Sequence, residues 1–250
     1  MHSRVEIAVD AGESGRTRFT RLAADGGLAV RQTSATGVHL IGTAAGPIGD
    51  DVIDIAIIVG RGATLQVHGV AATICLPGTD NESSQLTLTI MLHSDSNFEC
   101  ALPSLIVCQG ARISATTEVV AEESSLLSLD EQVSLGRAGE SGGEWRNRTV
   151  VDIQGRPALR QTQTSDSVLD AVSRMSGDRL SSGAIVSRLE LGPVGERPHS
   201  TTLGGAMSLD LAVPGRLMTS VGRDLLLANR DLDSLRSFDA RLDAAGTVAD

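Results

Sequence analysis

The pentapeptide Gly139-Glu140-Ser141-Gly142-Gly143 fits the G-x-S-x-G pattern that places the nucleophile in many hydrolases. That serine is reactive because a sharp turn between a strand and a helix exposes its hydroxyl, and an acid and a histidine follow it along the chain. Here residues 145–154 have the pattern of a strand, and the only later histidine is His199, in a proline-flanked segment. A hairpin loop is therefore the favoured interpretation, and a β-rich serine hydrolase using Ser141 is the alternative.

Imidazole and thiol ligands are sparse. No H-E-x-x-H pair would bring two imidazoles onto one helix face, so a stable zinc site is not expected. His68 and Cys75 flank a predicted turn and could approach each other, but one imidazole and one thiol leave a metal site two ligands short. The histidines and cysteines are His2, His39, His68, His93, His199, Cys75, Cys100 and Cys108.

Carboxylates stand at two more suggestive places. Asp50 and Asp51 follow a Gly-Pro turn at the start of a predicted strand, and Asp130 and Glu131 lie just before Gly136-Arg137. Acids beside turns ordinarily hydrogen-bond to the local backbone or are solvated. Asp51 could therefore simply cap its turn, and Glu131 could pair with an arginine such as Arg137.

The composition excludes several classes of function. The chain contains no Lys, which removes P-loop and Schiff-base chemistry. A net charge of -10 disfavours nucleic acid as a partner. No apolar run approaches the ~20 residues that cross a bilayer. The unpaired cysteines and the acidic residues near Met1, where a signal peptide would be apolar, indicate a cytoplasmic protein.

Alternation of apolar and polar residues with period 2 dominates the chain and predicts strands. Residues 85–92 show it most clearly, with Leu86, Leu88, Ile90 and Leu92 on one side. The other predicted strands are Arg4–Val9, Thr17–Ala23, Val38–Thr43, Val52–Val59, Thr64–Val70, Leu105–Cys108, Arg112–Ala121, Leu126–Leu135, Arg148–Gln154, Ile185–Leu191, Ala206–Val213 and Leu217–Leu227.

Two segments in the C-terminal half have helical spacing instead. One begins after Ser165-Asp166 and is closed by Gly177; the other begins after Asp231 and is closed by Gly246. Many strands joined by short Gly and Pro turns predict stacked sheets. No linker divides the chain, so residues 1–250 are expected to form a single domain. No repeat of 20 to 50 residues is evident, so the sequence does not demand a regular solenoid.

The order of motifs along residues 16–162 resembles the urease accessory protein D family (UreD/UreH). The segments that carry the resemblance are Arg16–Leu22, Gly27–Arg31, Thr43–Asp51, Gly62–Leu65, Val70–Thr73, Leu135–Arg137 with Gly143-Glu144, and Gly155–Leu159. The last third matches more loosely. Asp50, Ser104 and Gln161 depart from the family's usual residues, and their effect on metal transit is left open.

The resemblance implies a mainly β protein, a β-helix-like two-layer stack of mixed sheets with two short helices in the C-terminal half. It implies a non-enzymatic chaperone component for nickel insertion that links apo-urease to accessory protein F and to the GTPase accessory protein G. No cofactor would be tightly bound, and nickel would only pass through. By position, Asp51, Thr73 and Glu131 match residues that would line a nickel tunnel. A β scaffold unrelated to metal is a further alternative.

Overall fold

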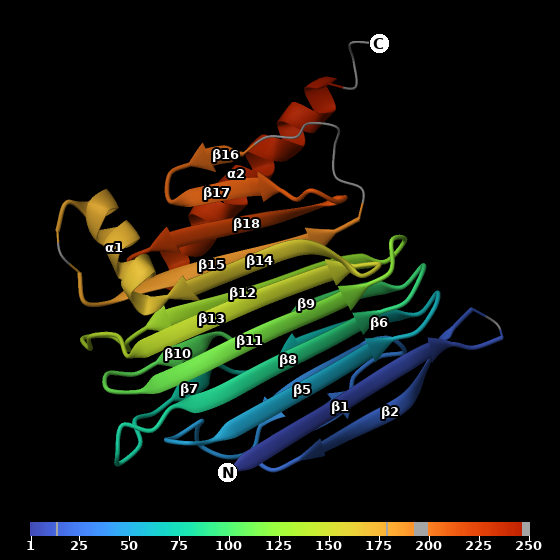
Figure 1. Ribbon diagram of the computed structural model, residues 1–250, viewed down its shortest axis with the longest axis horizontal. Helices are drawn as coiled ribbons and strands as arrows, with labels where there is room; N and C mark the ends of the chain where they lie inside the picture. Colours follow the sequence, from blue (N-terminus) through green and yellow to red (C-terminus); the bar gives the residue numbers. More distant parts are fainter. Residues whose placement is uncertain (14, 179, 193–199, 247–250) are drawn as a thin grey trace.

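The alternation of the sequence builds two stacked sheets, whose facing sides form the core. The computed structural model describes residues 1–13, 15–178, 180–192 and 200–246. Along the chain, strands of one sheet alternate with strands of the other (Figure 1). In β1 (His2–Ala11), for example, Val5, Ile7 and Val9 are buried while the residues between them are more exposed. The stack begins with the N-terminal strands at one end, and the C-terminal helix lies at the other.

The first sheet has seven strands, several of them long and parallel. Its order is β14-β13-β11-β8-β5-β1-β2, with β2 and β14 added antiparallel at the edges. After β1 its strands are β2 (Thr17–Asp25), β5 (Val52–Val59), β8 (Ser84–Leu92), β11 (Arg112–Ala121), β13 (Glu144–Ile153) and β14 (Arg156–Thr164).

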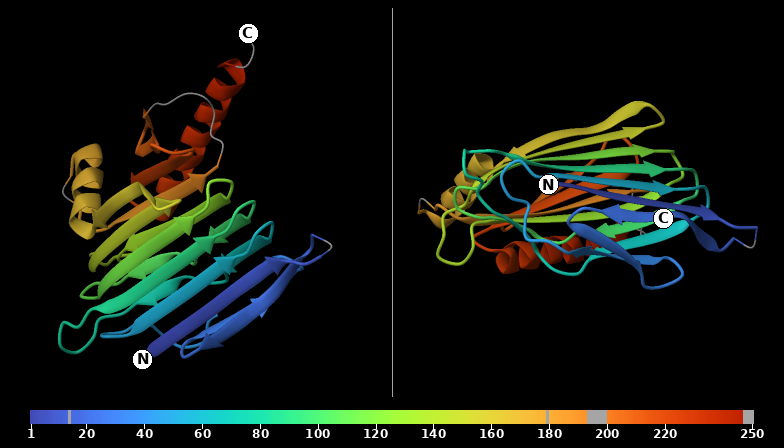
Figure 2. Two further views of the ribbon diagram at one scale, coloured as in Figure 1. Left: turned by 45° about the vertical axis from the view of Figure 1, so that its right-hand side comes forward. Right: turned by 90° about the horizontal axis from the view of Figure 1, so that it is seen from below.

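The second sheet faces the first, as the view from below shows (Figure 2). Its order is β16-β17-β18-β15-β12-β9-β6-β4-β3. Off this path, the short strand β10 (Leu105–Val107) pairs with β12, and β7 (Thr73–Cys75) pairs with β10. The remaining strands are β3 (Leu28–Gln32), β4 (Gly37–Gly42), β6 (Thr64–Gly69), β9 (Asn97–Ala101), β12 (Leu126–Leu135), β15 (Gly183–Leu191), β16 (Thr201–Leu203), β17 (Ala206–Asp210) and β18 (Gly215–Gly222).

Between β5 and β13 the chain coils like a β-solenoid. It passes from one sheet to the other and back, and each new strand pairs in parallel with the strand one coil earlier: Val52 pairs with Gln85, and Ser84 with Ile113. One coil thus takes about 30 residues, within the range of known solenoid repeats. The coil requires only that apolar and polar residues alternate in each strand, and the residues themselves can differ from one coil to the next. The sequence therefore shows no repeat.

Two buried clusters fill the space between the sheets. The larger spans most of the stack, and Phe98 is among its fully buried side chains. The smaller lies near the first helix and contains Val107, Trp145, Val172 and Ile185. The core is largely aliphatic, as a chain with an aromatic fraction of 2% requires.

Both helices lie in the C-terminal half, as predicted. Helix α1 (Ser165–Ser176) begins with a capping box between Thr164 and Ser167 and ends at Gly177 in the left-handed conformation. Helix α2 (Leu225–Gly246) covers the outer face of the second sheet, where Ala228 and Leu232 contact Val186 and Met218.

The second helix corrects two boundary predictions. It begins at Leu225, seven positions before the start predicted after Asp231, and the strand predicted to continue to Leu227 ends at Gly222. The carboxylate of Asp224 accepts a hydrogen bond from the Leu227 amide at 2.8 Å and so caps the helix there. The apolar Leu225–Leu227 run suits a strand by composition, but this cap makes it helical.

Five strands were not predicted: β3, β7, β9, β14 and β16. Four of them have only three to five residues, too few to show a period. β14 is an edge strand with largely polar side chains, and Pro157 is tolerated where the register shifts opposite Asp152. The strand predicted to end at Val213 ends instead at Asp210. Among the described helices, none is long and apolar enough to cross a membrane.

Candidate functional site

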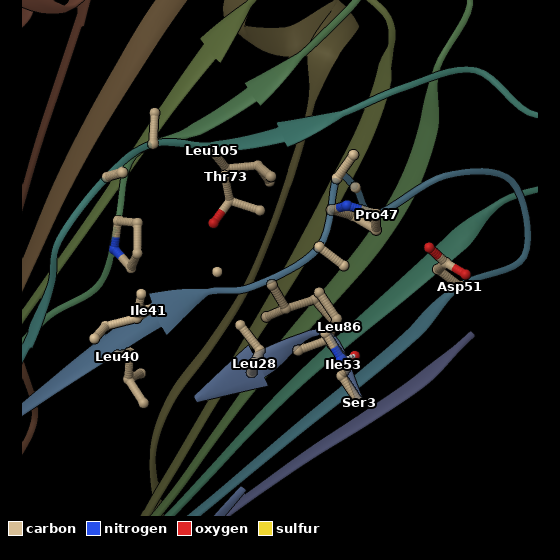
Figure 3. A pocket seen from close by; sticks show the side chains of 18 of the residues that line it. Ser3, Leu28, Leu40, Ile41, Pro47, Asp51, Ile53, Thr73, Leu86 and Leu105 are labelled. Carbon is tan, nitrogen blue, oxygen red and sulfur yellow. Dashed lines mark hydrogen bonds between the residues drawn. The ribbon is translucent and has the colours of Figure 1, made fainter. Parts of the chain in front are cut away.

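A cavity of about 210 Å³ lies beside the cis-prolyl turn at Gly46-Pro47 (Figure 3). Its walls come from the ends of strands in both sheets and from the loop before Thr73, and they are mainly apolar. Asp51 and Thr73 both line it. Figure 3 places Asp51 on one side of the cavity and Thr73 on another, with Pro47 between them in this view. The structure thus brings together two of the three residues predicted to line a tunnel.

Two hydrogen bonds hold the carboxylate of Asp51. One carboxylate oxygen accepts a hydrogen bond from the Ile48 amide at 2.9 Å, and the other pairs with the amino group of Met1. Desolvation by the surroundings opposes ionisation, but these two hydrogen bonds keep the pKa of Asp51 below its usual value. The alternative that Asp51 caps its turn is therefore confirmed, and its carboxylate is charged where it meets the cavity.

Thr73 is fixed by its backbone rather than by its hydroxyl. Its amide donates to the Ser104 carbonyl at 2.9 Å, which ties β7 to the start of β10. The side chain is half-buried and contributes a polar oxygen to the wall near Leu105.

A second cavity of about 50 Å³ lies next to the first, and Glu131 lines it. The two are neighbours because four apolar residues line both: Leu86, Leu102, Pro103 and Leu105. The wall of the second cavity is also mainly apolar, and its polar residues besides Glu131 are Gln132, Asn147, Gln163 and Ser187.

Glu131 points into the space between the sheets. Thr117 donates a hydrogen bond to its carboxylate at 2.7 Å across the sandwich. Burial raises the pKa of Glu131, and hydrogen bonds from Thr117 and Asn147 only partly oppose this. The predicted alternative of a pair with Arg137 is wrong, because that arginine pairs with Glu140 within its own loop. The neighbouring Asp130 points the other way and pairs with Arg188.

Glu131 belongs to a layer of polar side chains that crosses the apolar core. Thr117 pairs in register with Thr149 in the first sheet, and Glu131 with Ser187 in the second. Ser187 and Thr219 are within 3.5 Å of each other and extend the layer.

Two residues that line this cavity each have a buried polar atom without a hydrogen-bond partner among the described residues: Trp145 Nε1 and Asn147 Oδ1. Buried polar groups ordinarily find a hydrogen-bond partner, and a cavity of this size with polar atoms in its wall has room for water. The small cavity is therefore suited to water, or to a small hydrated ion held by oxygen atoms.

Sequence reasoning missed Thr117 and Asn147, although a signal was present. In β12 the inward positions are Leu127, Leu129, Glu131, Val133 and Leu135, so Glu131 occupies an apolar slot in a period-2 pattern. Thr117 does the same between Ala115 and Val119 in β11. A polar residue at an inward strand position is rare enough to mark a site.

The remaining candidates from the sequence do not assemble. Ser141 lies in the loop between β12 and β13, so a strand rather than a helix follows it and the context of a nucleophile elbow is missing. His199 lies outside the described residues. Cys75, Cys100 and Cys108 are buried and free, and desolvation raises the pKa of the Cys75 thiol to about 11. Cys75 contacts the Arg112 carbonyl.

No group of three or more His, Cys, Asp or Glu side chains is placed to hold a metal ion within the part of the chain that the structure describes. The candidate site is thus a pair of adjacent cavities with separated oxygen atoms: Asp51 and Thr73 in the first, and Glu131 in the second.

Comparison with known proteins shows to which family the chain is similar. The profile of the family described as UreD urease accessory protein matches residues 2–218. The chain belongs to the UreD family of urease accessory proteins. It is 30% identical to urease accessory protein UreD of Parafrankia sp. (strain EAN1pec), over 94% of this chain and 88% of that one. It is 32% identical to urease accessory protein UreD of Streptomyces coelicolor, over 90% and 92% of the two chains.

The match to the UreD family indicates the general function of the chain. The members of this family are accessory proteins of urease, so membership supports a role in urease maturation. The resemblance seen in the sequence is confirmed, and the loosely matching last third is largely included in the aligned part of these relatives.

Proposed function

We propose that this chain is a non-enzymatic, cytoplasmic component of the urease maturation machinery. It scaffolds a complex that links apo-urease to accessory proteins F and G, and it passes nickel toward the urease active site. The observation that carries the proposal is the UreD family match across most of the chain, together with two adjacent cavities between the sheets.

The chemistry of the cavities supports transit rather than storage. Their polar atoms are mainly carboxylate, hydroxyl and amide oxygens, spaced apart and not gathered into a closed set. Thiolates and imidazoles in a closed site would bind a borderline metal such as nickel tightly, whereas scattered oxygens and water release it. Asp51, Thr73 and Glu131 would serve as successive weak contacts for the ion.

The first test is reconstitution of urease with its other accessory proteins, with and without this chain. We expect nickel-loaded, active urease only when the chain is present. Equal nickel per active site without it would contradict the proposal. Co-purification with the urease subunits and accessory protein F tests the scaffold role, and failure to co-purify would favour a β scaffold unrelated to metal.

Variants of the cavity residues test nickel transit separately from assembly. The double variant Asp51→Ala with Glu131→Ala should lower nickel per urease active site while the complex still assembles. Because Asp51 caps its turn, the single variant Glu131→Gln is the cleaner test, since it keeps the shape and an oxygen that can accept from Thr117. Glu118→Gln, on the exposed side of β11, is the matched control. If urease receives the normal amount of nickel with both Glu131 variants, Glu131 is not part of the nickel path.

A further inference from the structure

Two histidines that are far apart in the sequence stand side by side on the second sheet. His39 of β4 and His68 of β6 pair directly across these parallel strands, and their ring centroids are 6.2 Å apart in an edge-to-face arrangement. The flanking Val38, Leu40 and Val67 are buried in the core. Both imidazoles therefore project from the outer face, where they are half-buried.

This geometry is close to that of a two-imidazole chelate. A nitrogen to metal distance of ~2.0–2.1 Å places the centroids of two adjacent ligand rings roughly 4.5–5.5 Å apart. The observed 6.2 Å is only slightly longer, so chelation would require a rotation of the two side chains. Hydrogen bonding between the strands fixes the two backbones, so little conformational freedom is lost when an ion binds.

The surroundings leave room for an ion. On the β9 side His68 is opposite Ala101, whose small side chain leaves space for metal-bound water. Glu99 lies diagonally from His68, accepts a hydrogen bond from Gln66 at 2.9 Å and adds a negative charge nearby. Arg31 is opposite His39 on β3 and is exposed, so its long side chain can extend into solvent away from the pair.

The pair also lies next to the first cavity. Ile41 and Val70 follow the two histidines by two positions along the chain, and both line that cavity. Two residues of a strand span roughly 6.6 Å. Val70 is 57% exposed, so this part of the cavity wall reaches the surface.

We propose that His39 and His68 together bind one divalent transition-metal ion, such as Ni²⁺, on the outer face beside the rim of the first cavity. Imidazole nitrogen suits nickel, copper and zinc, and with only two protein ligands the remaining positions are left to water. Such a site captures and releases an ion. That the ion then enters the cavity rests on the proposed function; that the pair binds metal does not.

Equilibrium dialysis of the full chain, without an affinity tag, against NiCl₂ at pH 7.5 tests the site. The wild-type chain should bind Ni²⁺ at this pair, and His39→Ala or His68→Ala should weaken that binding roughly tenfold or more, because one imidazole replaces a chelate. His93→Ala is the matched control and should bind like wild type. His2→Ala, measured alongside, accounts for chelation by the N-terminal amine and His2.

Imidazole NMR spectra of the wild-type chain give a readout that does not depend on any variant folding. Substoichiometric Ni²⁺, which is paramagnetic, should broaden the signals of His39 and His68 before those of His93. Equal broadening of all histidines, or variants that bind Ni²⁺ like wild type, would overturn the proposal.

Urease maturation separates this site from the proposed function. With limiting nickel, both histidine variants should require more Ni²⁺ than wild type for the same urease activity. A chain that binds Ni²⁺ at the pair but is dispensable for urease loading would overturn the proposed function and leave the metal site standing. A chain that is required for urease loading but binds no Ni²⁺ at the pair would overturn the metal site and leave the proposed function standing.

Discussion

At the scale of single residues, the most informative side chain is Glu131. Its position in β12 would suit a leucine, since Leu129 and Val133 on either side face the core. The carboxylate is held there by Thr117 and Asn147, and no cation among the described residues pairs with it, since the neighbouring Arg188 pairs with Asp130. Such burial costs stability, as it disfavours the charged form. A residue that costs stability and is not needed for packing points to a role in function.

The raised pKa of Glu131 predicts a definite dependence of stability on pH. Between the unfolded pKa, near 4.5, and the higher folded pKa, only the folded state holds this proton, so stability falls as pH rises through that window. Glu131→Gln should therefore be more stable than wild type at pH 7 to 8 and should flatten the dependence above pH 4.5. Urea unfolding at a series of pH values measures this. Glu118→Gln is the control, and parallel pH curves for Glu131→Gln and wild type would contradict the argument.

At the scale of elements, local signals in the sequence revealed both helices but not the short strands of the sheets. Gly177 closes α1 where the sequence predicted its end, and the cap Thr164 starts the helix two residues before the start predicted after Ser165-Asp166. Both signals act within one turn of the chain. The short strands β7 and β9 could not be recognised in this way, because a strand of three to five residues is stabilised by its neighbours in the sheet and not by its own sequence.

Removal of the cap of α1 should have a measurable effect. Thr164→Ala deletes the hydroxyl that accepts from the Ser167 amide and should lower the free energy of unfolding by about 1 kcal/mol. Thr162→Ala, two residues earlier in β14 and exposed, is the control for the loss of a threonine in this strand. Urea midpoints of the two variants compare them directly, and an equal effect of both would show that the capping bond adds nothing.

At the scale of the whole molecule, the core between the sheets holds the coils together. Phe98 is fully buried in a core with few aromatic residues, and it belongs to a mainly aliphatic cluster to which both sheets contribute. In a solenoid-like stack each coil is stabilised mainly by its neighbours, so a defect in a central coil affects both sides.

Phe98→Ala should accordingly lower the free energy of unfolding by about 3–5 kcal/mol, the usual cost of deleting a buried phenyl ring and leaving a cavity. Phe238 of α2 is 37% exposed, so Phe238→Ala should cost much less. Thermal unfolding followed by circular dichroism compares the two variants with wild type. A smaller effect at Phe98 than at Phe238 would mean that the central coils do not limit stability.

The sequence by itself determined the β-rich class, most of the long strands, the two helices and the family resemblance. These follow from local patterns: alternation with period 2, turns at Gly and Pro, and capping residues. Only the tertiary structure decided which residues meet. The paired positions His39 and His68, or Thr117 and Glu131, are joined by strand pairing and sheet packing between segments separated along the chain. Local periodicity carries no information about such contacts, because any alternating strand can pair with any other until the coil sets the register.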